Sequence, residues 1–204
     1  MQTKETMMSV KPFAITLDVG TSLANRTGSW RTLKPVYVDR LPPCNTKCPA
    51  GEQCQAWLFH AQSGNYENAW KQIIEDNPFP AVMGRVCYHT CQGACNRNGI
   101  DEPVGINAVE RFLGDYALEK GWQLPVPAAD TGKRILIVGA GPAGLSAAYQ
   151  LRRLGHAVHV VESAEAAGGM MRYGIPKYRL PREVLDQEIA RITALGVEFE
   201  FGRE

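Results

Sequence analysis

Six cysteine residues, placed in two groups in the first half of the chain, are the residues best suited to chemistry. The first group has the spacing Cys-x3-Cys-x5-Cys and the second Cys-x3-Cys-x3-Cys: Cys44, Cys48, Cys54, Cys87, Cys91 and Cys95. Thiolates that converge from loops and first helical turns bind iron–sulfur centres or zinc. Pro49, directly after Cys48, matches the Cys-Pro pair of ferredoxin-type ligation. The pattern favours an iron–sulfur centre, with zinc as the alternative.

The N-terminal sequence bears on whether these cysteines form disulfides instead. The start, MQTKETMMSV, lacks the apolar core and small-residue cleavage site of a secretory signal. We therefore expect a cytoplasmic protein, in which thiols stay reduced. Lys and Arg total 22 against 21 Asp and Glu, and this formal charge of +1 argues against a nucleic-acid or anionic-membrane surface. The apolar runs are too short to span a membrane, so a soluble protein is expected.

A glycine-rich turn in the second half of the chain has the spacing of a dinucleotide site. The turn reads Gly-x-Gly-x-x-Gly, and its residues include Gly139, Gly141, Pro142, Ala143 and Gly144. The first glycine permits a tight turn, the second admits a pyrophosphate, and the third lets helix and strand pack closely. The phosphates then meet the positive end of the following helix.

The sequence around this turn strengthens the prediction. A β-branched run at 133–138 precedes it, a helical stretch follows, and a second strand is expected at 157–161. Glu162 follows that strand, 18 residues after Gly144. Its carboxylate is expected to accept hydrogen bonds from both adenosine ribose hydroxyls and to oppose a 2′-phosphate. The turn therefore favours FAD or NAD over NADP.

Apolar periodicity predicts the remaining elements. Helical spacing occurs in the segments 52–62, 66–76, 104–120 and 182–195. In the last helix, Glu188 and Arg191 lie outside the apolar stripe, and alternation after it predicts a strand near 197–201. The predicted organisation is an extended arm at 1–40 with a short strand at 35–38, a helical domain at 41–122, a linker at 123–132, and the truncated start of a Rossmann-like domain at 133–204.

Two long motifs resemble the flavin domain of the glutamate synthase small-subunit family, which includes the flavin portion of dihydropyrimidine dehydrogenase. They are GAGPAGLSAAYQLRRLGHAVHVVE and GGMMRYGIPKYRLP. The resemblance implies FAD at the glycine-rich turn. It also implies that Gly168 and Gly169 run along the flavin side of the site.

The cysteine segments resemble the helical iron–sulfur domain of the same family through LPPCNTKCPAGEQCQAWL, GRVCYHTCQGACN and VGINAVERF. Family members carry two 4Fe-4S clusters. The resemblance implies that Cys48, Cys87 and Cys91 bind one cluster with Glu110 as a non-cysteine fourth ligand. It implies that Cys44 and Cys95 contribute to the other. The fold class is therefore a multi-domain α and α/β protein, with an all-helical iron–sulfur domain before an incomplete Rossmann-like FAD domain.

The chain departs from the family pattern at the second cluster. No cysteine precedes Cys44, and the six cysteines with Glu110 give seven ligands where two clusters need eight. Cys54 is either recruited as a ligand or is an ordinary buried thiol. His89 is expected to be a solvated loop residue and His60 a packing or capping residue. One cluster is expected and a second is left open.

Redox chemistry is the function class that these motifs favour, because no nucleophile elbow, carboxylate pair or phosphate-binding P-loop is present. The resemblance implies the electron-transfer portion of an NAD(P)H-linked oxidoreductase, a fragment or subunit that exchanges electrons with a catalytic partner. The nicotinamide would bind in a domain that is missing here, and no catalytic residue is required of this chain. The alternatives are an iron–sulfur carrier or docking module without turnover, and a zinc-stabilised interaction domain.

Overall fold

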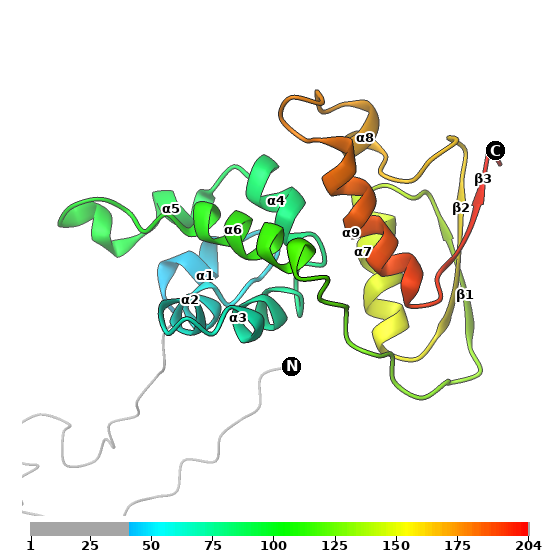
Figure 1. The fold of residues 1–204 in the computed structure, drawn as a ribbon, viewed down its shortest axis with the longest axis horizontal. Coiled ribbons are helices and arrows are strands. Elements are labelled where there is room, and N and C mark those ends of the chain that lie inside the picture. The colour runs from blue at the N-terminus through cyan, green and yellow to red at the C-terminus, as the bar shows by residue number, and fades with distance from the viewer. Residues whose placement is uncertain (1–40, 204) are drawn as a thin grey trace, which may run out of the picture. The chain divides into compact units, whose positions relative to one another are not determined.

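A three-stranded parallel sheet forms the C-terminal part of the computed structural model, which describes residues 41–203 (Figure 1). The strands β1 (Arg134–Val138), β2 (Ala157–Glu162) and β3 (Glu198–Phe201) pair in the order β1-β2-β3. Leu136 pairs with His159, which in turn pairs with Glu198. Parallel strands require crossover connections. Helix α7 (Pro142–Arg153) joins β1 to β2, and the short α8 (Met170–Tyr173) and α9 (Arg182–Ala194) join β2 to β3.

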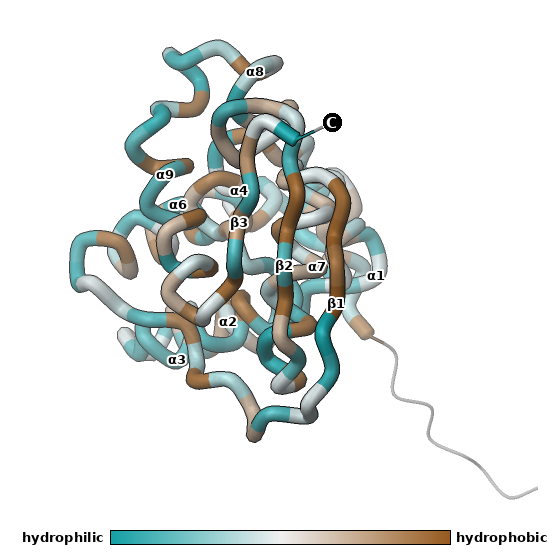
Figure 2. Tube along the Cα trace, turned by 90° about the vertical axis from the view of Figure 1, so that its right-hand side faces the viewer, coloured by the Kyte–Doolittle hydropathy of each residue, from teal (hydrophilic) through white to brown (hydrophobic). Residues whose placement is uncertain are grey.

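The two long crossover helices cover one face of this sheet (Figure 1). Val158 and Val160 of β2 point into that covered face and are buried. Leu136 and Val138 of β1 lie on the opposite face and are 63% and 81% exposed. Figure 2 views the sheet from that side and shows the apolar character of β1.

Short and medium helices make up the N-terminal part of the described chain. They are α1 (Pro43–Lys47), α2 (Cys54–Gln62), α3 (Tyr66–Ile73), α4 (Pro80–Val86), α5 (Thr90–Gly93), the 3-10 helix η1 (Asn96–Gly99) and α6 (Ile106–Glu119). The periodic segments correspond to α2, α3, α6 and α9, within a few residues at each end. None of the helices within residues 41–203 is long and apolar enough to cross a membrane.

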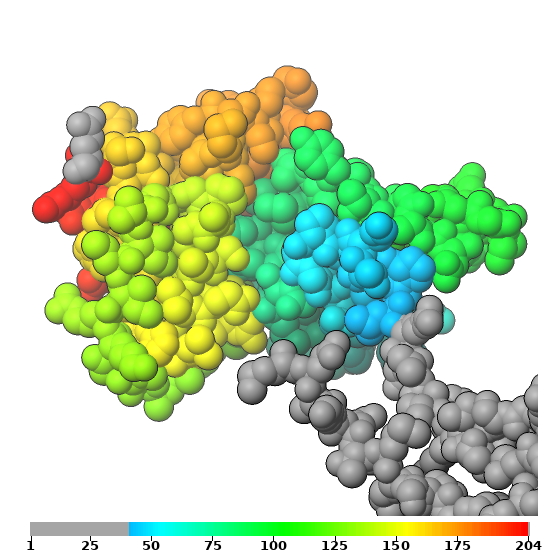
Figure 3. Space-filling view, turned by 180° about the vertical axis from the view of Figure 1, so that it is seen from behind, coloured from blue at the N-terminus to red at the C-terminus, as the bar shows by residue number. Residues whose placement is uncertain are grey.

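The helical part and the sheet part share a hydrophobic core. Trp70 and Phe79, from the helical part, belong to the same buried cluster as Leu145 and Tyr149 of α7. The Tyr149 hydroxyl donates to the Ile74 carbonyl oxygen at 2.8 Å. Leu124, in the predicted linker, is also buried in this core. From Leu41 onward the chain therefore forms one compact unit, and the two parts adjoin in the space-filling view (Figure 3).

Helices α4 and α6 approach each other closely because glycine lies at the contact on both helices. A Cβ atom added to Gly84 would lie 2.4 Å from the Arg111 Cα atom. A Cβ atom added to Gly114 would lie 2.3 Å from the Ala81 nitrogen. Side-chain atoms do not fit at these distances, so backbone packs against backbone at both positions.

The polar side of α9 is the main difference from the sequence-based expectation. Glu188 is fully buried and Arg191 is 8% exposed, although both lie outside the apolar stripe. Neighbouring α4 and Trp70 contact these two side chains, which explains their burial. The predicted arm and its short strand at 35–38 lie outside the described residues.

Candidate metal centre and dinucleotide site

Most of the cysteines lie at or near helix ends, where side chains and free backbone groups turn toward the same space. Cys48 follows α1, Cys54 begins α2, Cys87 follows α4, and Cys95 precedes η1. Cys44 and Cys91 lie within the short helices α1 and α5. The Thr90 hydroxyl donates to the Lys47 carbonyl oxygen at 2.8 Å, which joins the two cysteine groups. All six cysteines are free, so the structure gives no support to a disulfide framework.

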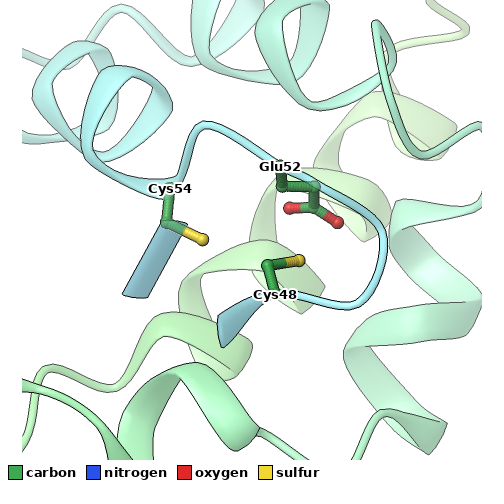
Figure 4. A group of neighbouring side chains, drawn as sticks. All are labelled: Cys48, Glu52 and Cys54. Atoms are coloured by element: carbon green, nitrogen blue, oxygen red, sulfur yellow. The ribbon is translucent and has the colours of Figure 1, made fainter. Parts of the chain in front are cut away.

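Two thiols of the first cysteine group and one carboxyl group meet in one place. The Sγ atoms of Cys48 and Cys54 and a carboxylate oxygen of Glu52 lie within 4.8 Å of one another (Figure 4). Cys54 is 1% exposed and lies in the same buried cluster as Cys91. The neighbouring Cys54 thiol lowers the pKa of Cys48 to about 6 and the pKa of Cys91 to about 7, against the effect of burial. Both therefore favour the thiolate form that binds metals.

The other three cysteines border this group. Burial raises the pKa of Cys87, which also lies within electrostatic range of Glu110 and Cys91. The backbone N–H of His89 donates to the Cys87 sulfur at 3.4 Å. Burial likewise raises the pKa of Cys44, near Cys91 and Cys95. The structure thus brings all the predicted cysteine ligands and Glu110 into one region.

Two buried carboxyl groups lie beside the thiols without a cation to balance them. The side-chain amide of Asn77 donates to Glu52 at 2.8 Å and to Glu110 at 2.9 Å. Burial raises the pKa of Glu52 to about 7 and that of Glu110 to about 9. Neither carboxyl takes part in a salt bridge within residues 41–203. The donor set fits a positively charged iron centre, which would favour the ionised forms.

Glu52 and Asn77 were not predicted as site residues. Asn77 precedes Pro78, and this pair indicated only the end of a helix. Glu52 lies two residues before Cys54, so its proximity to a cysteine was the available signal. Their convergence depends on the packing of α2 and α3 against α6, which has no local sequence pattern.

The glycine-rich turn has the backbone geometry that its residue types predicted. Gly139 has φ 95°, a left-handed conformation that favours glycine. A Cβ atom on Gly144 would lie 1.9 Å from the Gly139 carbonyl oxygen, so only glycine allows this approach of helix to strand. Gly141 caps the N-terminus of α7, and Pro142 occupies its first turn. Ala143 follows in the same turn, where backbone N–H groups are free to bind phosphate.

Glu162, at the end of β2, and Gly168 and Gly169, in the loop after it, lie beside this turn. The Gly168 N–H donates to the Ala140 carbonyl oxygen at 2.8 Å. Gly169 has φ 47°, and a Cβ atom there would lie 2.8 Å from the Gly141 Cα atom. Glu162 accepts from the Ala140 N–H at 2.6 Å. Backbone donors, including that of Ala164, lower the pKa of Glu162 and keep it anionic at the end of β2. We call this site, formed by the turn 139–144 with Glu162, Gly168 and Gly169, the flavin cradle. Its geometry fits an adenine dinucleotide, and the predicted residues line it.

Comparison with known proteins supports both halves of this description. Residues 38–122 match a family described as dihydropyrimidine dehydrogenase domain II, 4Fe-4S cluster, and residues 137–189 match NAD(P)-binding Rossmann-like domains. The beta subunit of an NADP(+)-dependent formate dehydrogenase from Moorella thermoacetica is 39% identical over 178 residues. A homolog of PreT, a subunit of NAD-dependent dihydropyrimidine dehydrogenase, from Salmonella typhi is 40% identical over 160 residues. The glutamate synthase [NADPH] small chain of Bacillus subtilis is 38% identical over 153 residues.

The chain is a homologue of these oxidoreductase subunits. The three alignments cover 76%, 78% and 74% of this chain but only 25%, 39% and 31% of the relatives. The chain therefore spans well under half the length of each. The resemblance to the glutamate synthase small-subunit family is confirmed, as is the order of a helical iron–sulfur domain followed by a Rossmann-like domain.

Proposed function

We propose that the chain is the electron-transfer portion of an NAD(P)H-linked iron–sulfur flavoprotein oxidoreductase. The observation that carries this proposal is the convergence of cysteine thiols around uncompensated buried carboxyls, in one compact unit with a dinucleotide cradle. The relatives are named as NADP-, NAD- and NADPH-linked enzymes, which supports a nicotinamide as one electron partner. Reduced thiol ligands also accord with the cytoplasm as the site of action.

The helical part holds the iron. Cys48, Cys87 and Cys91 bind one 4Fe-4S cluster, and Glu110, whose charge interacts with all three thiols, supplies the fourth ligand. Cys44 and Cys95 contribute to a second cluster if one is bound. Cys54 lies beside Cys48 and is either a further ligand or an ordinary buried thiol next to the cluster. Asn77 orients both neighbouring carboxyls through its amide group.

The sheet part holds FAD. Gly139, Gly141 and Gly144 keep side chains away from the pyrophosphate, and Pro142 and Ala143 place the first turn of α7 beneath it. Glu162 is an anion at the end of β2 and would exchange its backbone donors for ribose hydroxyls. Gly168 and Gly169 form the opposite wall. No side chain of this site transfers a proton in the proposed role.

The bound groups supply the redox chemistry. FAD can exchange two electrons with a nicotinamide and pass them singly, and a 4Fe-4S cluster carries one electron at a time. With FAD in the single cradle of this sequence, the nicotinamide binds on a further domain, and a catalytic partner subunit or fused domain completes the reaction. The short span of each relative that the chain covers supports such a division of labour.

Anaerobic purification followed by assays of iron, acid-labile sulfide, zinc and flavin tests the proposed function. We expect a brown protein with iron and sulfide in equal amounts and with bound FAD. Iron and FAD that are both absent, or zinc as the only metal, would refute it. Iron and sulfide without FAD would instead identify an electron carrier or docking module.

A further inference from the structure

Glu188 of α9 is a fully buried carboxyl that joins the sheet part to the helical part. One carboxylate oxygen accepts from the Ala81 N–H at 3.1 Å and the other accepts from the Val82 N–H at 3.3 Å. These amides belong to the first turn of α4, where backbone N–H groups have no partner within the helix. Arg191, one turn later, places its guanidinium 5.2 Å from the centre of the Trp70 ring. The polar side of α9 thus makes specific contacts with α4 and with Trp70.

Helix α4 leads directly from Glu188 to the proposed iron ligands. The helix is seven residues long, and Cys87 forms its C-cap. Gly84 and Gly114 bring its backbone against α6, which carries Glu110. Because neither glycine has a side chain that separates the two helices, we expect a movement of α4 to displace α6 as well. A shift at the start of α4 therefore displaces both Cys87 and Glu110.

Helix α7, which packs against the sheet beside α9, begins at the flavin cradle. Helix α7 begins at Pro142, directly after its N-cap Gly141, and packs against α9. It makes its own contacts with the helical part, because Gln150 and Arg153 both donate to the Glu75 carbonyl oxygen, at 2.9 and 2.7 Å. Glu75 follows α3 in the chain. The contact of Glu188 with α4 is the one that continues to the ligand residues.

We propose that Glu188 is a positioning residue that fixes the helix bearing Cys87 relative to the flavin cradle, so that electrons pass efficiently between the two centres. This inference rests on the proposed function. FAD held at the turn of Gly139, Gly141 and Gly144 would supply single electrons, and an oxidised cluster held by Cys48, Cys87 and Cys91 would accept them one at a time. A nicotinamide would reduce the flavin in the complete enzyme, and a sacrificial donor such as EDTA under illumination would reduce it in the test.

The test compares Glu188→Leu, which removes both acceptor oxygens, with Glu188→Gln, which keeps the volume and one acceptor oxygen. Glu183→Gln is the control, because Glu183 is exposed on the same helix. Measurements are made at pH 9, where Glu188 is ionised, because burial raises its pKa to about 8. Amide hydrogen exchange on the cofactor-free protein reports the contact itself. Cluster EPR and flavin-to-cluster transfer after flash reduction of the purified holoprotein report its consequence.

We expect faster exchange at the start of α4 and altered cluster EPR in Glu188→Leu, with FAD content unchanged. Because loss of the contact would shift Cys87 and Glu110 relative to the flavin cradle, the transfer rate should fall below that of wild type. Glu188→Gln should lie between this variant and wild type, and Glu183→Gln should match wild type. If Glu188→Leu does not fold, the intermediate behaviour of Glu188→Gln decides.

The positioning role would be overturned if every folded Glu188 variant had the amide exchange, cluster EPR and transfer rate of wild type. It would also be overturned if Glu183→Gln changed these three quantities as much as the Glu188 variants do. Neither result would affect the proposed function, provided that the wild-type protein contains iron and FAD. Wild-type protein without both cofactors would refute the proposed function and, with it, the positioning role in electron transfer.

Discussion

The close contact of α4 with α6 predicts a stability cost for Gly114→Ala. The new Cβ atom would lie 2.3 Å from the Ala81 nitrogen and 2.7 Å from the Pro80 carbonyl carbon. Ordinary contacts lie at about 3.5 Å or more, so the helices would have to separate by about 1 Å. Both neighbours are backbone atoms, which cannot rotate away. Overpacking costs about 1–3 kcal/mol, and the immovable backbone neighbours place Gly114→Ala in the upper part of that range, at about 2–3 kcal/mol.

An opposing effect reduces this cost. Alanine favours the interior of a helix over glycine by about 1 kcal/mol, and Gly114 lies inside the 14-residue α6. The expected net loss is about 1–2 kcal/mol, or a decrease in Tm of about 2–8 °C for a chain of this size. Because Glu110 lies one turn away on α6, anaerobic iron content should decrease as well.

Urea denaturation of the cofactor-free protein measures this loss without a contribution from bound iron. The matched control is Gly99→Ala, where an added Cβ atom meets nothing within 4 Å and φ is not left-handed. The control should lie within about 0.5 kcal/mol of wild type. A Gly114→Ala variant as stable as the control would show that backbone contact does not set the spacing of α4 and α6.

Three further predictions concern the charge at the α9 contact and the two proposed sites. Burial raises the pKa of Glu188 to about 8 from its ordinary 4.5, so between these pH values the folded state holds a proton that the unfolded state releases. Wild-type stability should therefore fall relative to Glu188→Gln as pH rises from 5 to 8, by up to about 1.4 kcal/mol per pH unit, and parallel urea-denaturation curves would contradict this. Cys48→Ser should lower iron and labile sulfide in anaerobic protein, and unchanged iron would exclude Cys48 as a ligand. Gly141→Ala should retain wild-type stability, because its Cβ atom would come no closer than 3.9 Å to Gly169. Flavin titration should nevertheless show FAD binding weakened about tenfold or more, which equals about 1.4 kcal/mol. Unchanged affinity for FAD would count against the cradle.

Local patterns in the sequence predicted the longer elements and the chemical classes of both sites. Helices α2, α3, α6 and α9 have enough turns for apolar periodicity to be visible. The short helices α1, α4, α5 and α8 span four to seven residues and were not predicted, because so few turns give no period. The individual ligand and cofactor roles, including those of Cys54 and Glu110, stay predictions.

The sequence by itself determined which residues could bind iron and a dinucleotide, because thiol spacing and glycine spacing are local properties of the chain. Tertiary structure alone decided that Glu52, Asn77 and Glu110 share one buried hydrogen-bonded group. It also decided that Glu188, outside the apolar stripe of its helix, is buried against the first turn of α4. Burial and pKa depend on neighbours as far as 107 residues away in the chain, and helical periodicity records only the neighbours along one element.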